Sequence, residues 1–203
     1  MNKITYALLG MAAVVFIGCA DLDYNEASNR DEDWTYNSPL NGVKALVYDV
    51  YAQMPSEFKD DSYGNGALIA SATDESEFAL SFSPIHKYFN GGWTPSNPFS
   101  TTWDRSYRAI TQVHMYLERI HKIDLSDYKY DPDYQTMVQQ FEIFPYELRF
   151  LRTYFYFELV RAYGDVPLVT TTLTNEQANS VERPPAKDVF KFIINELDAV
   201  AEY

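Results

Sequence analysis

The chain has 203 residues, which is enough for one domain, and its 46% of hydrophobic and 22% of charged residues are close to the average for globular proteins. The formal net charge is −13. This charge disfavours a general affinity for nucleic acid or for anionic lipid, because both ligands are themselves negatively charged.

The first 18 residues have the pattern of a secretory signal peptide. Lys3 supplies a positive charge, and the apolar run from Ile4 to Gly18 is too short to span a membrane as a helix. Cys19, the only cysteine in the chain, follows Gly18 directly and resembles the cysteine of a bacterial lipobox. We therefore expect cleavage after residue 18 and lipidation of Cys19; the alternative is an ordinary signal peptide followed by an incidental cysteine.

Residues 19–37 form a predicted acidic tether. Their acidic side chains are Asp21, Asp23, Glu26, Asp31, Glu32 and Asp33. Such a segment buries little apolar area, so we expect it to be extended. It also resembles the acidic stretch that follows the lipidated cysteine in surface-exposed lipoproteins of Bacteroidetes.

Apolar residues at helical spacing predict helical regions near 38–54, 101–120, 133–163 and 186–203. Ser38 and Pro39 suit the start of the first region, which Pro55 ends. Pro145 lies inside the third region, which is therefore either kinked or divided there. The sequence predicts a mainly α fold of helix pairs that resemble tetratricopeptide hairpins, although no 34-residue period is present.

Residues 56–99 are rich in glycine and proline and have few helix signals. A loop of this length is uncommon inside a compact domain unless it serves a function. We therefore look for a binding site in this region.

The stretch RFLRTYFYFELVRAYGDVPLV, residues 149–169, is either an aromatic ligand platform or helix core. Because its apolar residues cover most sides of a helix, we expect it to be buried. Gly164 is then expected to end the helix in the αL conformation. Arg161 and Asp165 either pair across that end or are solvated separately.

Three ordered segments are similar to the pattern of the SusD/RagB family. The first is FLRTYFYFELVRAYGDVPLV at 150–169, in which Thr153 replaces the usual alanine. The second is ERPPAKDVFKFIINELDAV at 182–200. The third consists of Trp103, Tyr107 and Ile110, which match the W-x-x-x-Y-x-x-I that comes earlier in the family.

This resemblance implies an outer-membrane, surface-exposed lipoprotein of Bacteroidetes with tetratricopeptide-like helix pairs and irregular loops. Members bind glycans, or in some cases peptides, over a SusC-like TonB-dependent transporter, and they are not enzymes. Members are typically more than twice as long. We therefore interpret residues 38–203 as the N-terminal part of a SusD-like helical domain, apparently truncated and incomplete at its C-terminus.

The resemblance also indicates a ligand site in the long irregular region. By position, Trp93 resembles the family's loop aromatic, and Asp74 and Asn97 resemble its polar partners. Asn90 is a further amide that suits sugar hydroxyls. The alternatives are that Trp93 is a buried loop anchor and that Asp74 is a helix cap or makes a loop hydrogen bond.

Other chemistry has little support in the sequence. Asp74 and Glu77 are the carboxylates that a glycosidase would need, but acidic residues are abundant and nothing distinguishes this pair. His114, Glu118 and His121 share a helix face, which we interpret as a polar face rather than a metal site. No cofactor motif is present. The alternative to glycan binding is a helical-repeat scaffold that binds protein and no nutrient.

Overall fold

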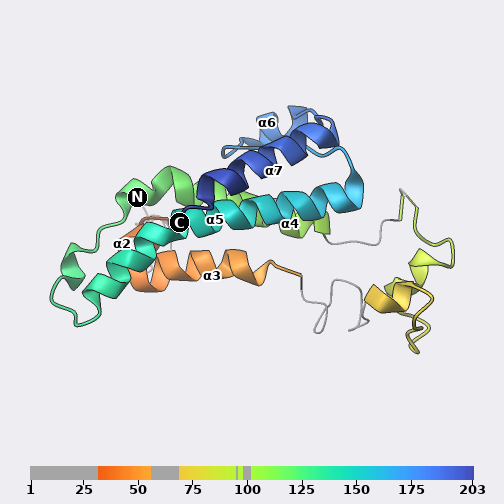
Figure 1. Cartoon of the computed structure of the whole chain (residues 1–203), viewed down its shortest axis with the longest axis horizontal. Helices are drawn as coiled ribbons and strands as arrows, with labels where there is room; N and C mark the ends of the chain where they lie inside the picture. The colour runs from red at the N-terminus through yellow and green to blue at the C-terminus, as the bar shows by residue number, and fades with distance from the viewer. Residues whose placement is uncertain (1–31, 56–68, 95, 98–101) are drawn as a thin grey trace, which may run out of the picture. The chain divides into compact units, whose positions relative to one another are not determined.

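The computed structural model describes residues 32–55, 69–94, 96–97 and 102–203, and most of them are helical (Figure 1). In chain order the helices are α2 (Glu32–Asn37), η1 (Pro39–Val43), α3 (Lys44–Ala52), η2 (Ile69–Ala72), η3 (Pro84–Tyr88), α4 (Thr102–Arg119), η4 (Ile120–Lys122), η5 (Ser126–Tyr128), α5 (Tyr134–Tyr163), α6 (Asn175–Ser180) and α7 (Ala186–Val200). The predicted mainly α fold is confirmed. The predicted signal peptide and the lipidated Cys19 lie outside the described residues.

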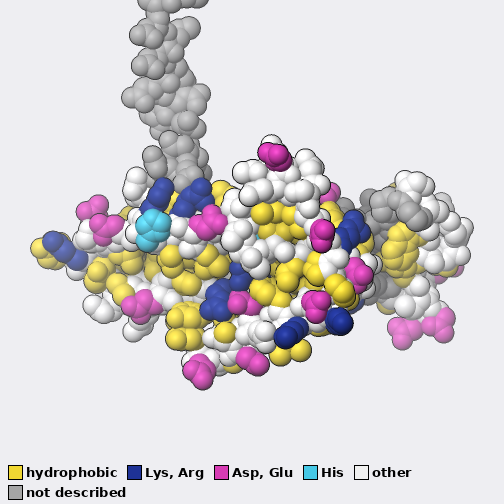
Figure 2. All heavy atoms as spheres, turned by 90° about the horizontal axis from the view of Figure 1, so that it is seen from above, with side chains coloured by type: hydrophobic (Ala, Val, Ile, Leu, Met, Phe, Trp, Pro, Cys, Tyr) yellow, Lys and Arg dark blue, Asp and Glu magenta, His cyan; other side chains and the backbone are white. Residues whose placement is uncertain are grey.

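Charged side chains of both signs share the surface of the described region. On the face that Figure 2 shows, lysine and arginine side chains lie beside acidic ones rather than in one basic patch. This distribution agrees with the net charge of −13 and offers a polyanion no broad surface to bind on this face.

The helical domain includes the last six residues of the predicted tether. Residues 32–37 form α2, where Tyr36 is only 3% exposed and donates its hydroxyl hydrogen to the Met115 carbonyl oxygen at 3.0 Å. Gly42 packs closely on this helix, since a Cβ placed there would lie 2.2 Å from the Thr35 carbonyl oxygen. The rest of the tether, residues 19–31, lies outside the described residues.

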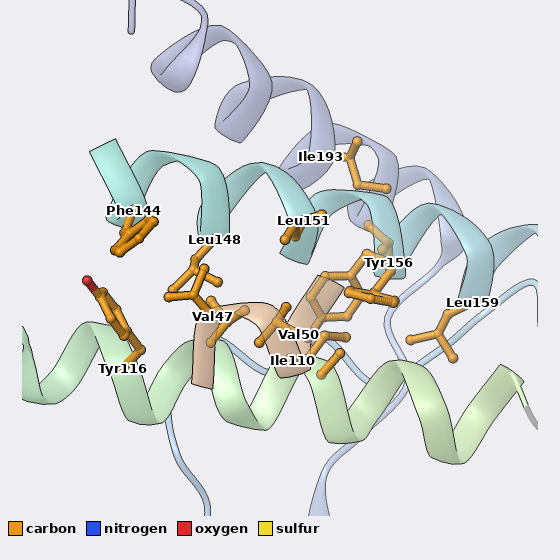
Figure 3. Close-up of a cluster of buried hydrophobic side chains, with 14 of the residues drawn as sticks. Val47, Val50, Ile110, Tyr116, Phe144, Leu148, Leu151, Tyr156, Leu159 and Ile193 are labelled. Carbon is orange, nitrogen blue, oxygen red and sulfur yellow. The ribbon is translucent and has the colours of Figure 1, made fainter. Parts of the chain in front are cut away.

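The core lies where α3, α4 and α7 pack against α5 (Figure 3). α4 and the following α5 form an antiparallel helix pair, and α7 packs along α5 (Figure 1). The buried side chains of this core include Val47 and Val50 of α3, Ile110 and Tyr116 of α4, Phe144, Leu148, Leu151, Tyr156 and Leu159 of α5, and Ile193 of α7. The predicted apolar stripes therefore face one another, and the expected helix pairing is confirmed.

α5 is one continuous helix of 30 residues with Pro145 inside it. The aromatic run is mainly core, because Phe155 and Tyr156 are fully buried. Phe150 and Phe157 are exceptions, at 50% and 43% exposed. The prediction of a buried helix is therefore confirmed for most of the run and does not hold for these two rings.

The turn after α5 differs from the predicted geometry. Gly164 has φ +72° as expected, but its ψ of −115° lies far from the αL value of about +47°. The expected αL cap is therefore wrong, because the chain leaves the helix directly into an extended segment. Gly164 still donates its N–H to the Val160 carbonyl at 2.9 Å, and Asp165 accepts from the Ala186 N–H at 2.8 Å, which caps the start of α7.

An ion-pair cluster joins α5 to α7. Arg149 donates to both carboxylate oxygens of Glu196 at 3.1 and 3.0 Å, and Arg152 donates to Glu196 Oε2 at 2.6 Å. The guanidinium of Arg152, which is 7% exposed, also lies 5.4 Å from the centre of the Phe192 ring. Burial raises the pKa of Glu196, but the hydrogen bonds from both arginines outweigh it and hold that pKa below its ordinary value.

Tyrosine hydroxyls fix the extended segment that follows α5. Tyr156 donates to the Val169 carbonyl at 2.6 Å and accepts from the Val169 N–H at 2.8 Å. Tyr107 donates to the Pro167 carbonyl at 2.7 Å. Further along, Glu118 accepts from both the N–H and the hydroxyl of Thr172 at 2.8 Å. The segment is therefore held to α4 and α5 mainly through side-chain contacts with its backbone.

We predict that Glu196→Gln lowers the free energy of unfolding by about 2–3 kcal/mol, because the buried Arg152 guanidinium loses its charged partner. This decrease is smaller than that expected for breaking a fully buried ion pair, since part of the cluster reaches solvent. Denaturant unfolding at pH 7 measures the change in the free energy of unfolding. Asp198→Asn, at an exposed position of the same helix, is the control and should change stability by less than about 0.5 kcal/mol.

The pairing of Glu196 with Arg149 and Arg152 predicts that the free energy of unfolding depends on pH. The folded pKa of Glu196 is below its ordinary 4.5, so its contribution is complete above that pH and is lost as the pH falls through the folded pKa. The stability gap between wild type and Glu196→Gln should therefore narrow below about pH 4.5. A gap that stays constant down to unfolding would contradict the assigned pairing.

We also predict that Gly164→Ala lowers the free energy of unfolding by about 1–3 kcal/mol, because residues with a Cβ avoid this φ and ψ. A Cβ at this position meets no atom within 4 Å, so the whole effect comes from backbone strain. Gly164→Asn should not recover the loss, since asparagine tolerates αL and this residue is not αL. Recovery in the asparagine variant, seen as a restored thermal midpoint, would argue for an αL cap in solution.

Candidate functional site

The segment around η3 has a small core of its own. Ile85 is fully buried, and Ala72, Phe78 and Tyr88 pack against it. Ser83 caps η3 by accepting from the Ile85 N–H at 3.4 Å. These contacts give the segment a defined local structure in which its exposed side chains have fixed positions.

A network of hydrogen bonds closes the loop that follows η3. The Asn90 side-chain oxygen accepts from the Gly92 N–H at 2.8 Å, and the Asn97 amide donates to the Gly92 carbonyl at 3.0 Å. Lys87 donates to the Asn97 side-chain oxygen at 2.8 Å. A bridge between Thr94 and Asn97 completes the closure. The loop backbone on both sides of residue 93 is therefore held in place.

Trp93 lies at the exposed side of this loop. Its indole is 46% exposed, and it meets the Tyr88 ring nearly edge to face, with ring centres 4.8 Å apart at 69°. The structure therefore does not bury Trp93 as a loop anchor. The contact with Tyr88 orients the ring, and much of its surface is open to solvent.

The structure brings three of the four predicted site residues together. Asn90, Trp93 and Asn97 belong to the same closed loop, where both amide side chains hydrogen-bond to the loop itself. Asp74 is exposed in a separate turn after η2. That turn is closed by Thr73, which donates to the Ala70 carbonyl at 2.7 Å and accepts from the Glu75 N–H at 3.2 Å.

Sequence reasoning missed two exposed aromatic residues in the same segment. Phe82 is 71% exposed and Phe89 is 54% exposed. Phe89 lines a hollow together with Glu77, Phe78, Ala79, Ser81, His86 and Asn90. No periodic pattern marks these residues, and the available signal was that Phe89 lies within HKYFNGGW, residues 86–93, the stretch that also contains Asn90 and Trp93.

A second hollow, of about 290 Å³, lies between α4 and the extended segment after α5. Its lining is Trp103, Tyr107, Ile110, Thr111, Pro167, Val169, Thr171, Leu173, Ala178 and Val181. Trp103 packs against Tyr163 with ring centres 5.2 Å apart, and the Arg183 guanidinium lies 5.2 Å from its ring centre. These aromatic residues are therefore engaged in holding the helices and the segment together.

Two of the three residues on the predicted polar helix face have structural contacts, whereas α4 ends at Arg119 and His121 lies exposed in η4. Glu118 binds Thr172, and His114 is 2% exposed. Burial, together with the nearby charge of Arg152, lowers the pKa of His114 to about 4. Among the described residues, no three His, Cys, Asp or Glu side chains converge as metal ligands.

Within the described part of the chain, no helix has both the length and the apolarity needed to cross a membrane.

The helical arrangement is similar to that of solved SusD-like structures. A SusD-like protein from Bacteroides fragilis matches with a TM-score of 0.58 and 22% identity, over 85% of this chain and 30% of that protein. A SusD-like carbohydrate-binding protein from the same organism matches with a TM-score of 0.61 and 23% identity, over 83% and 32%. A laminarin-binding SusD-like protein matches with a TM-score of 0.54 and 21% identity, over 85% and 34%.

At these identities the structural matches establish the fold, and this chain spans about a third of the length of each matched protein. Comparison with curated protein sequences finds no match. A family model described as SusD-like, starch-binding and associating with the outer membrane matches residues 22–202. Because that match covers nearly the whole chain, this protein belongs to the SusD-like family.

Proposed function

We propose that this protein is a surface-exposed, lipid-anchored glycan-binding protein that captures oligosaccharides and passes them to a SusC-like TonB-dependent transporter. Membership of a family described as starch-binding supports the ligand class. The observation that carries the proposal is the half-exposed Trp93 indole on a loop closed by hydrogen bonds. Its place in the chain corresponds to the loop aromatic that the family resemblance implies.

The physical case rests on the chemistry of sugar rings. An aromatic side chain has a large flat surface that packs against the apolar C–H groups of a pyranose. The loop around Trp93 is already closed by the amides of Asn90 and Asn97, so less conformational entropy is lost when a ligand binds. A preorganised aromatic platform of this kind suits a polar ligand that has apolar C–H faces, such as a glycan.

The charge of the segment favours a neutral glycan. Asp74, Glu75 and Glu77 are all exposed beside the η2–η3 core. An anionic sugar would meet like charges there, which disfavours it as a ligand. Starch, from the description of the family, and laminarin, from the matched laminarin-binding protein, are therefore the first ligands to test.

We further propose that the protein binds glycan without cleaving it. The described family property is binding, and the exposed Asp74 and Glu77 carry no contacts that single them out as a catalytic pair. Reducing ends measured during incubation with either glucan should stay at the level of the blank.

The alternative of a protein-binding scaffold has one supporting observation. An apolar groove runs between α3, α5 and α7, lined by Tyr51, Ile143, Tyr146, Glu147, Phe150, Leu197, Val200, Ala201 and Tyr203. Exposed apolar surface of this kind also forms protein interfaces. Binding of a glycan at Trp93 favours the first function, whereas a protein ligand with no glycan binding favours the scaffold.

We predict that Trp93→Ala weakens binding to starch or laminarin oligosaccharides by about 1–3 kcal/mol, the range for losing a buried aromatic contact. Isothermal titration measures the affinity, and the thermal midpoint of the helices should be unchanged. Tyr130→Ala removes an 88% exposed aromatic ring from the α4–α5 connection and serves as the control. Affinity loss that only follows unfolding, or no loss, would remove Trp93 from the site.

The lipid anchor is tested separately. If Cys19 carries acyl chains, they anchor the protein stably in the membrane. Cys19→Ser removes the attachment point for these chains and should therefore move the protein from the membrane fraction to the soluble fraction. Immunoblots of both fractions measure this. Unchanged fractionation would contradict lipidation at Cys19, and would leave the glycan-binding proposal unaffected.

A further inference from the structure

We propose that the hollow lined by Phe89 and Asn90 is a second sugar subsite with Phe89 as its platform, so that the protein binds an oligosaccharide across Phe89 and Trp93. This inference rests on the proposed glycan-binding function. It assigns a ligand role to Phe89, Glu77 and Ser81. The binding affinity then depends on the length of the glycan and not only on its terminal unit.

Phe89 has the exposure and support that a platform needs. Its ring is 54% exposed and meets the His86 ring at 86°, with ring centres 5.2 Å apart. His86 is fixed in turn, because its Nε2 lies within hydrogen-bond distance of the Leu80 carbonyl at 3.0 Å. The ring is thus held at one side while more than half of its surface stays in contact with solvent.

The hollow combines this ring with hydrogen-bonding groups. Glu77 offers carboxylate acceptors, and the Ser81 hydroxyl both donates and accepts. The Asn90 oxygen is already bound to the Gly92 N–H, so the group that Asn90 offers to a ligand is its amide nitrogen. An apolar face with a few polar groups of both kinds is the usual composition of a small-molecule site, and it matches a sugar, which has apolar faces and hydroxyl edges.

The two platforms lie close enough for one glycan chain. Trp93 is four positions after Phe89, so their Cα atoms are at most about 14 Å apart. Asn90 connects the two places, since it lines the hollow and also holds the Gly92 N–H next to Trp93. At this separation a short oligosaccharide is long enough to reach both rings, whereas a single sugar unit is not.

The test compares ligands of increasing length on the full chain. Maltooligosaccharides and laminarioligosaccharides, from two sugar units upward, are titrated into wild type, Phe89→Ala and Trp93→Ala. We expect the affinity of the wild type to rise with the length of the ligand. Phe89→Ala should bind the longest ligand about 3- to 10-fold more weakly, which is the scale of one aromatic contact, and should bind the shortest ligand almost as well as the wild type. Trp93→Ala should lose affinity at every length.

Two further variants keep the result clear. Phe89→Leu preserves apolar packing on His86 but lacks a flat face, so it should show the same length-dependent loss with an unchanged thermal midpoint. Phe190→Ala removes a 40% exposed ring from α7 and should bind as wild type. If both Phe89 variants bind all ligand lengths with wild-type affinity, the proposal of a second subsite is wrong, whereas the proposed role of Trp93 is unaffected. If wild type binds none of the probes, the proposed function fails and the subsite fails with it.

Discussion

A buried guanidinium is the constraint on which the helical structure depends. Arg152 sits in the middle of α5, 7% exposed, and its charge is balanced by Glu196 of α7, which Arg149 also binds. If Glu196 is removed, the buried Arg152 guanidinium loses its charged partner, which favours the docking of α7 on α5 in this register. The ion pair also joins the two longest segments that resemble the family pattern, residues 150–169 and 182–200. The resemblance in these segments therefore corresponds to a physical contact between them.

The candidate site has its own source of rigidity. Ile85 and its neighbours form a small core, and the amides of Asn90 and Asn97 close the loop that carries Trp93. Because these contacts are local, exposed residues in this segment can change without disturbing the Arg152–Glu196 pair. A fixed helical frame with a separately stabilised loop allows the exposed loop side chains to vary without a change in the helical core.

Periodicity was enough to predict the longer helices, because Val47 and Val50 share the buried face of α3 and Ile110 lies on the buried face of α4. It was not enough for the ends of elements. Tyr36 lies in an acidic stretch, and its burial depends on a hydrogen bond to Met115 that no local pattern contains. The ψ of Gly164 depends on where the following segment docks, through Tyr156 and Val169.

The site was only partly predictable for a related reason. An asparagine in a glycine-rich loop suits either a ligand or the backbone, and only the backbone path shows that Asn90 and Asn97 bind Gly92.

The most direct test of glycan binding at this loop is a nuclear magnetic resonance titration of the ¹⁵N-labelled chain with a laminarin or starch oligosaccharide. We predict shifts confined to residues 77–97 and the Trp93 indole N–H. Shifts centred instead on the Trp103 and Tyr107 hollow, or no shifts with any glycan, would contradict it.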